Sequence, residues 1–299
     1  MRNTIIVGAI ALLVTGHVRS QAVDTLAKIK STSTITMGVR DSTAFSYALG
    51  EGKYTGFHYD VCTNIIRDLK AKLGLPNLQT RYQLVTSQNR ISLVKNGTVD
   101  LECGATTNNE ARQREVTFAT TTYVEQVRMA VRADSPITSI RELNGKTVVT
   151  TTGTTSVQTL RKHERSSGVD FKELFGKDHS ESFLMLEQGR ADAYVIDSST
   201  LASLIAKSKS PKDYKIVGEI LSTEPIAIMI PKDDSAFKAA VDESIKNQAQ
   251  SGELEKLWVK WFLTPIPPNN IVINLPLSAA TKNAWQNPND KPAEAYAAK

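Results

Sequence analysis

Two separate series of alternating strand and helix patterns restrict the fold of this chain more than any other feature. The first series has predicted strands at residues 35–40, 78–85 and 99–103, with helices at 61–73 and 90–95. The second has predicted strands at 146–151, 191–197 and 214–217, with helices at 155–163, 180–188 and 199–207. Strands that alternate with helices are typical of a parallel sheet covered by helices. The sequence therefore predicts an α/β protein built from two such units.

An apolar, β-rich stretch at residues 124–131 separates the two series, and a strand of the same character follows the second series at 226–230. Two further helices are predicted, one around residues 237–245 and one at 253–262, each with an apolar face. The remaining residues, 278–299, are polar and rich in proline, so we expect this tail to be loosely held or to pack on the first unit.

Residues 1–22 have the pattern of a secretory signal peptide. Arg2 precedes an apolar run at 5–14, which is followed by the small residues Ser20 and Ala22. A membrane-spanning helix needs roughly twenty apolar residues, and this run is about half that length. We therefore expect cleavage near Ala22 and export of the remaining chain; the alternative is an uncleaved anchor.

The charge of the chain gives no sign of a nucleic-acid surface. The formal net charge is +5, and loss of Arg2 and Arg19 with the signal peptide lowers it to +3. The basic residues are spread along the sequence without Lys/Arg runs or interleaved aromatic residues. We therefore expect no nucleic acid among the partners.

The chain contains two cysteines, Cys62 and Cys103. Export to an oxidising compartment favours their pairing in a disulfide, which would join a helix of the first unit to the end of a later strand. The alternative is a reactive thiol, which requires a nearby histidine or helix end that lowers its pKa, and nothing in the sequence around either cysteine demands this interpretation.

Polar and cationic residues follow the predicted strands of both units. In sheets of this class, ligands bind beyond the carboxyl ends of the strands. The first unit places there Arg40, Ser87, Arg90, Ala105, Thr107 and Arg112, and the second places Thr155, His179 and Asp197.

These residues predict a site for an anion that also carries a positive group. Arginine binds carboxylates through two parallel hydrogen bonds, and helix N-termini offer free N–H groups to anions. Arg40, Arg90 and Arg112 against the single Asp197 give a formal charge of +2. A phosphate or a simple dicarboxylate would leave Asp197 facing another anion. A ligand with two carboxylates and one ammonium fits better.

Each of these residues also has an ordinary structural interpretation. A loop arginine is commonly a solvated surface charge. His179 can be a loop residue or a helix cap rather than a metal ligand, since no other histidine stands at metal-ligand spacing. Asp197 can simply cap the helix that follows it. Gly153-Thr-Thr155 lacks the lysine of a phosphate-binding loop, so it indicates only a helix start, and we expect neither a metal nor a cofactor.

Several short runs resemble the periplasmic glutamate/aspartate-binding proteins of ABC transport systems, which belong to solute-binding protein family 3. They are Thr86-Ser-Gln-Asn-Arg90, Glu102-Cys-Gly-Ala-Thr-Thr-Asn-Asn109 with Arg112, Lys177-Asp-His179, Pro265-Ile-Pro-Pro-Asn269 and Pro288-Asn-Asp290. The resemblance covers essentially the whole chain beyond the signal peptide.

The resemblance implies a role for each candidate residue. Arg112 would grip the α-carboxylate of the ligand with help from Thr107 and Thr155, and Asp197 would take the α-ammonium. The side-chain carboxylate would be recognised by Arg40, Ser87, Arg90 and His179. Relatives commonly have serine where this chain has Ala105, and only the backbone carbonyl of that residue remains available for the ammonium.

The resemblance also implies a type II periplasmic-binding-protein fold with two lobes, each a mainly parallel sheet flanked by helices, joined by two crossover strands. The first lobe would comprise residues 23–125 and 225–277, and the second residues 126–224. The expected function is capture of L-glutamate or L-aspartate by lobe closure and delivery, by a periplasmic monomer, to the membrane permease of an ABC importer. Two alternatives are an enzyme of the cyclohexadienyl or prephenate dehydratase type, with His179 or an unassigned glutamate of the cleft as general acid, and a ligand-sensing receptor domain.

Overall fold

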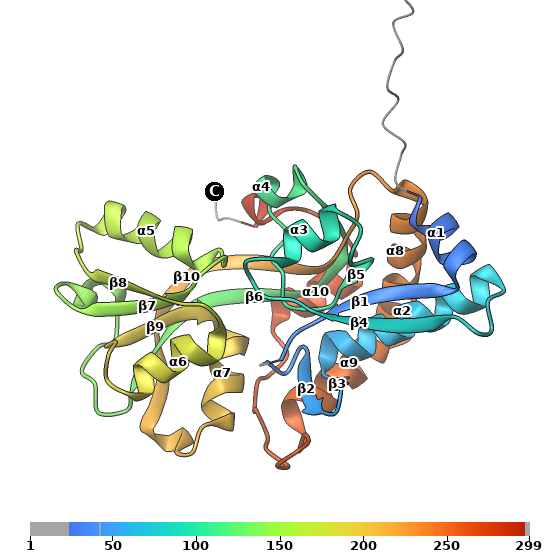
Figure 1. Ribbon diagram of the computed structural model, residues 1–299. Coiled ribbons are helices and arrows are strands. Elements are labelled where there is room, and N and C mark those ends of the chain that lie inside the picture. Colours follow the sequence, from blue (N-terminus) through green and yellow to red (C-terminus); the bar gives the residue numbers. More distant parts are fainter. Residues whose placement is uncertain (1–23, 42, 297–299) are drawn as a thin grey trace, which may run out of the picture.

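The computed structural model describes residues 24–41 and 43–296, so the predicted signal peptide lies outside the described residues. Its main feature is one eight-stranded sheet with the strand order β4-β1-β5-β10-β6-β9-β7-β8 (Figure 1). Strands β4, β1 and β5 are parallel to one another, as are β9, β7 and β8. The predicted α/β class with mainly parallel sheets is thus confirmed.

The first half of the molecule contains the elements from α1 to α4 and from α8 to the C-terminus. Its strands are β1 (Thr34–Val39), β2 (Tyr47–Gly50), β3 (Lys53–Thr55), β4 (Gln79–Leu84) and β5 (Leu101–Glu102). Its α-helices are α1 (Thr25–Thr32), α2 (Phe57–Leu73), α3 (Arg90–Lys95), α4 (Glu110–Gln113), α8 (Ser235–Gln250), α9 (Glu253–Trp258) and α10 (Ala279–Gln286). The β2–β3 hairpin was not predicted from the sequence.

The second half contains three strands and three α-helices. They are β7 (Thr147–Thr151), α5 (Ser156–Ser167), β8 (Lys172–Gly176), α6 (His179–Glu187), β9 (Ala193–Asp197) and α7 (Ser198–Lys207). Short helical turns at Ile140–Leu143, Pro211–Asp213, Val259–Leu263 and Ala293–Ala295 complete the molecule.

Two long strands, β6 (Thr117–Arg132) and β10 (Tyr214–Ile230), connect the halves. They pair antiparallel from Tyr214↔Arg132 at one end to Ile230↔Thr117 at the other (Figure 1). The sequence predicted only parts of them, at 124–131, 214–217 and 226–230. The predicted lobe boundaries at residues 125 and 225 fall inside these two strands, and the division into lobes stays a prediction.

The hydrophobic core is divided in the same way as the sheet. The largest buried cluster joins α2, α8 and α9 to β1 in the first half and includes the predicted core residues Trp258 and Trp261. Two smaller clusters lie in the second half, on either side of β7 and β9. Each half therefore has an apolar cluster of its own.

A disulfide joins Cys62 of α2 to Cys103, directly after β5. The predicted pairing is confirmed. It ties a helix to the strand end from which the Thr107 loop begins.

The tail is held in place rather than loosely attached. Trp285 of α10 is 9 % exposed, and its indole N–H donates to the carbonyl of Thr122 at 2.6 Å. Of the two expectations for this segment, packing on the first half is the one that the structure shows for residues up to 296. None of the helices among the described residues is sufficiently long and apolar to span a membrane.

Candidate ligand-binding site

The structure gathers all nine predicted ligand residues between the two halves, next to the carboxyl ends of their strands. Seven are buried and two, Ala105 and Thr155, are half-buried. They follow β1, β4 and β5 on one side and β7 and β8 on the other, in the connecting loops or in the helices that begin there, and Asp197 is the last residue of β9; this is the binding edge expected of an α/β sheet. They are not scattered over the outer surface.

The first half contributes a fixed pair of guanidinium groups. Arg40 donates from Nη2 to Oγ of Ser87 at 3.0 Å. Arg90, the first residue of α3, donates from Nη1 to the carbonyl of Ala105 at 3.0 Å and to Oγ1 of Thr106 at 2.7 Å. The buried Nε of Arg90 has no hydrogen-bond partner among the described residues. One donor of this guanidinium is therefore left for an acceptor that a ligand would supply.

Close approach of like charges makes this region receptive to an anion. Burial, and next the positive charge of Arg112, lower the pKa of Arg90 to about 9. The group is still charged at neutral pH, and its repulsion from Arg112 and Arg40 is partly offset by Glu102. A bound carboxylate would relieve the remaining repulsion.

Arg112 and Thr107 contact the second half directly. Arg112 donates from Nη1 to the carbonyl of Thr107 at 2.9 Å and from Nη2 to the carbonyl of Gly153 at 3.3 Å. The hydroxyl oxygens of Thr107 and Thr155 are 3.4 Å apart. The two halves are thus in contact across the site.

At Gly153 the backbones of the two halves approach each other closely. Its φ is +81°, and a Cβ added there would lie 2.6 Å from the carbonyl oxygen of Ser87 and 3.0 Å from Cα of Gln88. Only glycine meets both requirements, a left-handed conformation and no side chain.

His179 is the first residue of α6 and is buried beneath the arginines. Its Nδ1 lies 3.1 Å from Oγ1 of Thr151 and 3.2 Å from the hydroxyl of Tyr194. Burial, and then the charges of Arg40 and Arg90, hold the pKa of His179 well below its usual range. The imidazole is therefore neutral. It is not the cap of α6, because the carboxylate of Asp178 accepts from Glu181 N at 2.8 Å and fills that role.

Asp197 lies at the end of β9, at the N-cap position of α7, but its side chain makes no capping hydrogen bond. The simple capping interpretation is therefore wrong. Burial raises the pKa of Asp197 well above its usual range, as do the charges of Glu125 and Glu224, while Arg90 and Arg112 oppose the shift. An ammonium group beside Asp197 would favour its ionised form.

Sequence reasoning missed three acids, and the expectation of a single acid opposite the arginines is wrong. Glu102, Glu125 and Glu224 are each at most 3 % exposed and interact electrostatically with Asp197 or the arginines. Burial also raises the pKa of Glu125. The site therefore does not carry the fixed charge of +2 that counting predicted. A Glu inside an apolar strand, as at 102, was the available signal, because such a residue is costly unless it is paired.

Glu224 of β10 joins the two threonines. Its Oε2 accepts from the hydroxyl of Thr107 at 2.6 Å and from that of Thr155 at 2.7 Å, and its Oε1 accepts from Ser222 at 2.7 Å. Each threonine hydroxyl has one proton, which it donates to Glu224. Toward any further partner, each hydroxyl can therefore only accept a hydrogen bond.

Cavities open on both sides of these contacts. One, of about 450 Å³, is lined by Tyr47 and Pro267 of the first half and by Phe183 and Lys207 of the second. The other, of about 530 Å³, is lined by Thr107, Thr155 and Glu224 together with Ala293, Glu294 and Tyr296. Within residues 24–41 and 43–296, no group of three His, Cys, Asp or Glu side chains is placed to hold a metal ion.

Curated relatives match nearly the whole chain. The L-glutamate/L-aspartate-binding protein of Pseudomonas aeruginosa is 43% identical over 286 residues, which cover 95% of each chain. The glutamate/aspartate import solute-binding protein of Escherichia coli is 41% identical over 268 residues, 89% of each chain. Both are named as binding proteins.

Solved structures of binding proteins and solute receptors have a fold similar to that of this chain. The P235GK mutant of ArgBP from T. maritima aligns with a TM-score of 0.69 and 26% identity, covering 79% of this chain and 98% of that one. The solute receptor for L-cysteine of Neisseria gonorrhoeae aligns with a TM-score of 0.70 and 27% identity, covering 80% and 93%. The family model of bacterial extracellular solute-binding proteins, family 3, matches residues 35–264. With its fold, its buried polar site and these relatives, the chain belongs to the bacterial extracellular solute-binding proteins of family 3.

Proposed function

We propose that this protein captures L-glutamate or L-aspartate outside the cytoplasm and delivers it to an ABC importer. The observation that carries the proposal is the convergence of Arg40, Arg90 and Arg112 from separate segments onto one buried site, with Asp197 opposite them. The two curated relatives described above are named for the same ligands. Neither the arginine cluster nor the names of these relatives favours a dehydratase or a ligand-sensing receptor domain.

The geometry supports a division of the site by ligand group. Arg112, which contacts Gly153 across the site, would hold the α-carboxylate. Asp197 would take the α-ammonium, together with the carbonyl of Ala105 and the lone pairs that Thr107 and Thr155 present because their protons bind Glu224. In this proposal the two threonine hydroxyls therefore serve the ammonium, whereas the role that resemblance implied for them is to help hold the α-carboxylate.

The side-chain carboxylate would lie against the pair of guanidinium groups. Arg40 and Ser87 are already hydrogen-bonded, and Arg90 has its unpaired Nε. Neutral His179 would present its second ring nitrogen. These donors recognise a carboxylate through charge-assisted hydrogen bonds, which are about twice as strong as neutral ones.

Capture would proceed by closure of the two lobes about β6 and β10. Residues 23–125 with 225–277 would supply six of the ligand residues, and residues 126–224 would supply Thr155, His179 and Asp197. Closure removes water, which strengthens each charged contact. Residues 1–22 would direct export to the periplasm as a signal peptide and would then be cleaved off.

Calorimetric titration of residues 23–299 tests the proposal. We expect saturable binding of L-glutamate and L-aspartate and none of succinate, which lacks the ammonium that Asp197 would pair with. Absence of binding by both acidic amino acids would contradict the proposal, and turnover of a cyclohexadienyl acid would favour the enzyme instead.

A further inference from the structure

The C-terminal segment, residues 278–296, lies beyond the family match, which ends at residue 264. It is nevertheless a well-packed part of the molecule. It consists of α10 and an extended stretch that ends in the turn Ala293–Ala295. Its contacts concentrate on two features of the ligand site, namely β6 and the loop that carries Thr107 and Arg112.

The segment covers the edge of β6 that no strand pairs with. On one side β6 pairs with β10 along its length, but on the other it pairs with β9 only from Val127 to Val131. Before that point, the C-terminal segment takes the place of a strand. Thr121 N donates to the carbonyl of Asn289 at 2.8 Å, and Val124 N donates to Oγ1 of Thr281 at 3.0 Å. These bonds hold the crossover strand directly beside the predicted lobe boundary.

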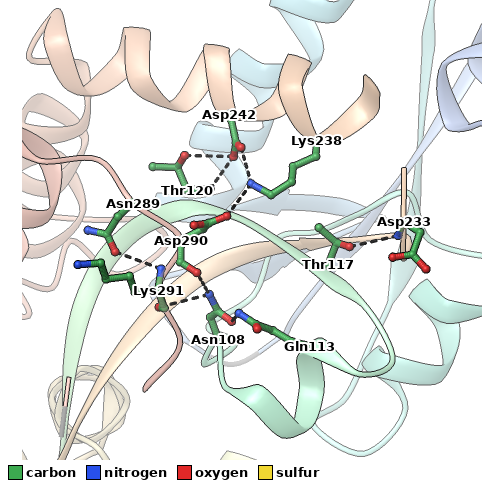
Figure 2. Close-up of polar contacts among 10 residues, drawn as sticks. All are labelled: Asn108, Gln113, Thr117, Thr120, Asp233, Lys238, Asp242, Asn289, Asp290 and Lys291. Carbon is green, nitrogen blue, oxygen red and sulfur yellow. Dashed lines mark hydrogen bonds and ion pairs between the residues drawn. The ribbon is translucent and has the colours of Figure 1, made fainter. Parts of the chain in front are cut away.

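The same segment holds Asn108, the neighbour of Thr107. Asn108 is fully buried, and its Nδ2 donates to the carbonyl of Asp290 at 2.8 Å (Figure 2). Its own carbonyl accepts from Ala293 N at 2.8 Å. Two residues further along the loop, Glu110 N donates to Oε2 of Glu294 at 3.1 Å.

An ion pair fixes the segment from the other side. Lys238 of α8 contacts Asp290 at 2.9 Å and Asp242 at 2.5 Å, and Asp242 accepts from Thr120 N of β6 at 2.6 Å (Figure 2). Asp290 is therefore positioned by both its side chain and its backbone.

We propose that the C-terminal segment is a positioning element of the ligand site, which fixes the Thr107–Arg112 loop against β6 in the geometry that binds the ligand. The loop supplies the grip on the α-carboxylate in the proposed function, on which this inference rests. A binding group must be held to within about half an ångström of its working position, and a loop without a support does not meet this demand. The segment also lines the cavity that contains Thr107, Thr155 and Glu224, so its loss would open this side of the site to water.

The test compares the mature chain with a variant that lacks residues 288–299 and keeps α10. We expect a rise of roughly tenfold in the Kd for L-glutamate, since misplacing a binding group by about 1 Å costs up to a hundredfold where it is measured for catalysis. We also expect faster hydrogen exchange of the backbone amides at residues 108–116 without ligand, and unchanged exchange in β7 and α5. A purely structural role would lower the melting temperature and leave both readouts unchanged.

A pair of single substitutions covers the case in which the deletion does not fold. Asn108→Ala removes the bond to Asp290, whereas Gln113→Ala removes only the bond from Gln113 to Oδ1 of Asn108. We expect Asn108→Ala to raise the Kd and to speed exchange in the loop, and Gln113→Ala to change either by less than a factor of about two.

Equal Kd values and equal loop exchange in the folded deletion, or in Asn108→Ala where the deletion does not fold, would overturn the inference while leaving the proposed function intact. Failure of the unaltered chain to bind an acidic amino acid would instead contradict the proposed function. The hydrogen-exchange measurement would still decide whether the C-terminal segment orders the Thr107–Arg112 loop.

Discussion

Gly153→Ala tests whether the contact between the halves is the ligand-binding geometry. The added methyl group would lie 2.6 Å from the carbonyl oxygen of Ser87, which belongs to the other half. When the lobes separate, this contact no longer exists. The substitution therefore acts on the closed form alone, apart from the strain of a positive φ, which both forms share.

The expected loss of affinity follows from the steric contact with Ser87, and the expected loss of stability from the positive φ. Inserting a methyl group into a packed contact costs about 1–3 kcal/mol. Because this cost falls on closure, it translates into a roughly 5- to 150-fold rise in the Kd for L-glutamate. The strain of the left-handed backbone, about 1–2 kcal/mol, lowers stability and is not part of the change in affinity.

Gly168→Ala is the matched control. Gly168 ends α5 in the same half with φ +68°, and a Cβ there would meet no atom within 4 Å. We expect both variants to lose similar thermal stability without ligand and only Gly153→Ala to lose affinity in calorimetry. Small-angle scattering with saturating glutamate should show incomplete compaction for Gly153→Ala alone. Equal affinities of the two variants for L-glutamate would show that the contact between Gly153 and Ser87 does not form on ligand capture.

Three further predictions concern single groups. Arg112→Ala should abolish binding of all amino acids in calorimetry, whereas Arg90→Ala should chiefly lose the preference for acidic ones. Each loss of binding free energy should amount to about 2–5 kcal/mol, as for removal of a buried charged group. Unchanged glutamate affinity in both variants would contradict the assignment of the two arginines. Replacing Cys62 and Cys103 by alanine should lower the free energy of unfolding in urea by about 4 kcal/mol, as estimated for their sequence separation of 41, and an unchanged midpoint would argue against the disulfide. The raised pKa of Asp197 in the empty site should fall when an ammonium lies beside it. At a pH between the pKa values of the empty and the occupied site, ligand binding should therefore release a proton, and affinity should increase as pH rises through that interval. A binding enthalpy that is the same in buffers of different ionisation enthalpy would exclude this proton release.

The sequence predicted the parts of the fold that depend on local pattern. Alternating strands and helices indicated the two halves, and Gly74 after residue 73 marked the end of α2, where it caps the helix with φ +65°. The joining of 214–217 and 226–230 into the single strand β10 was missed, because the polar residues between them interrupt the apolar pattern. Pairing with β6 stops at Val217 and resumes at Ser222 after a register shift, and no local sequence pattern predicts this irregularity.

The candidate site was predicted in part for a similar reason. Residues after strand ends converge by topology, so Arg40, Arg112 and Asp197 could be named from their positions alone. The acids Glu102 and Glu224 were not named, because they belong to the strands themselves and not to the residues that follow the strand ends; their contacts with Thr106 and Thr107 appear only in the folded molecule. The role of the C-terminal segment depends on backbone contacts between residues far apart in sequence, and no local pattern records them.

The relative affinity for L-glutamate and L-glutamine, measured by calorimetry on the same preparation, tests whether the site recognises a side-chain carboxylate. The two ligands have the same shape and differ in one charge, which the account places beside Arg90 and Arg40. We expect glutamine to bind at least about thirtyfold more weakly, since removing one partner of a buried charge pair costs about 2 kcal/mol or more. Glutamine binding as tight as glutamate, or tighter, would contradict the account.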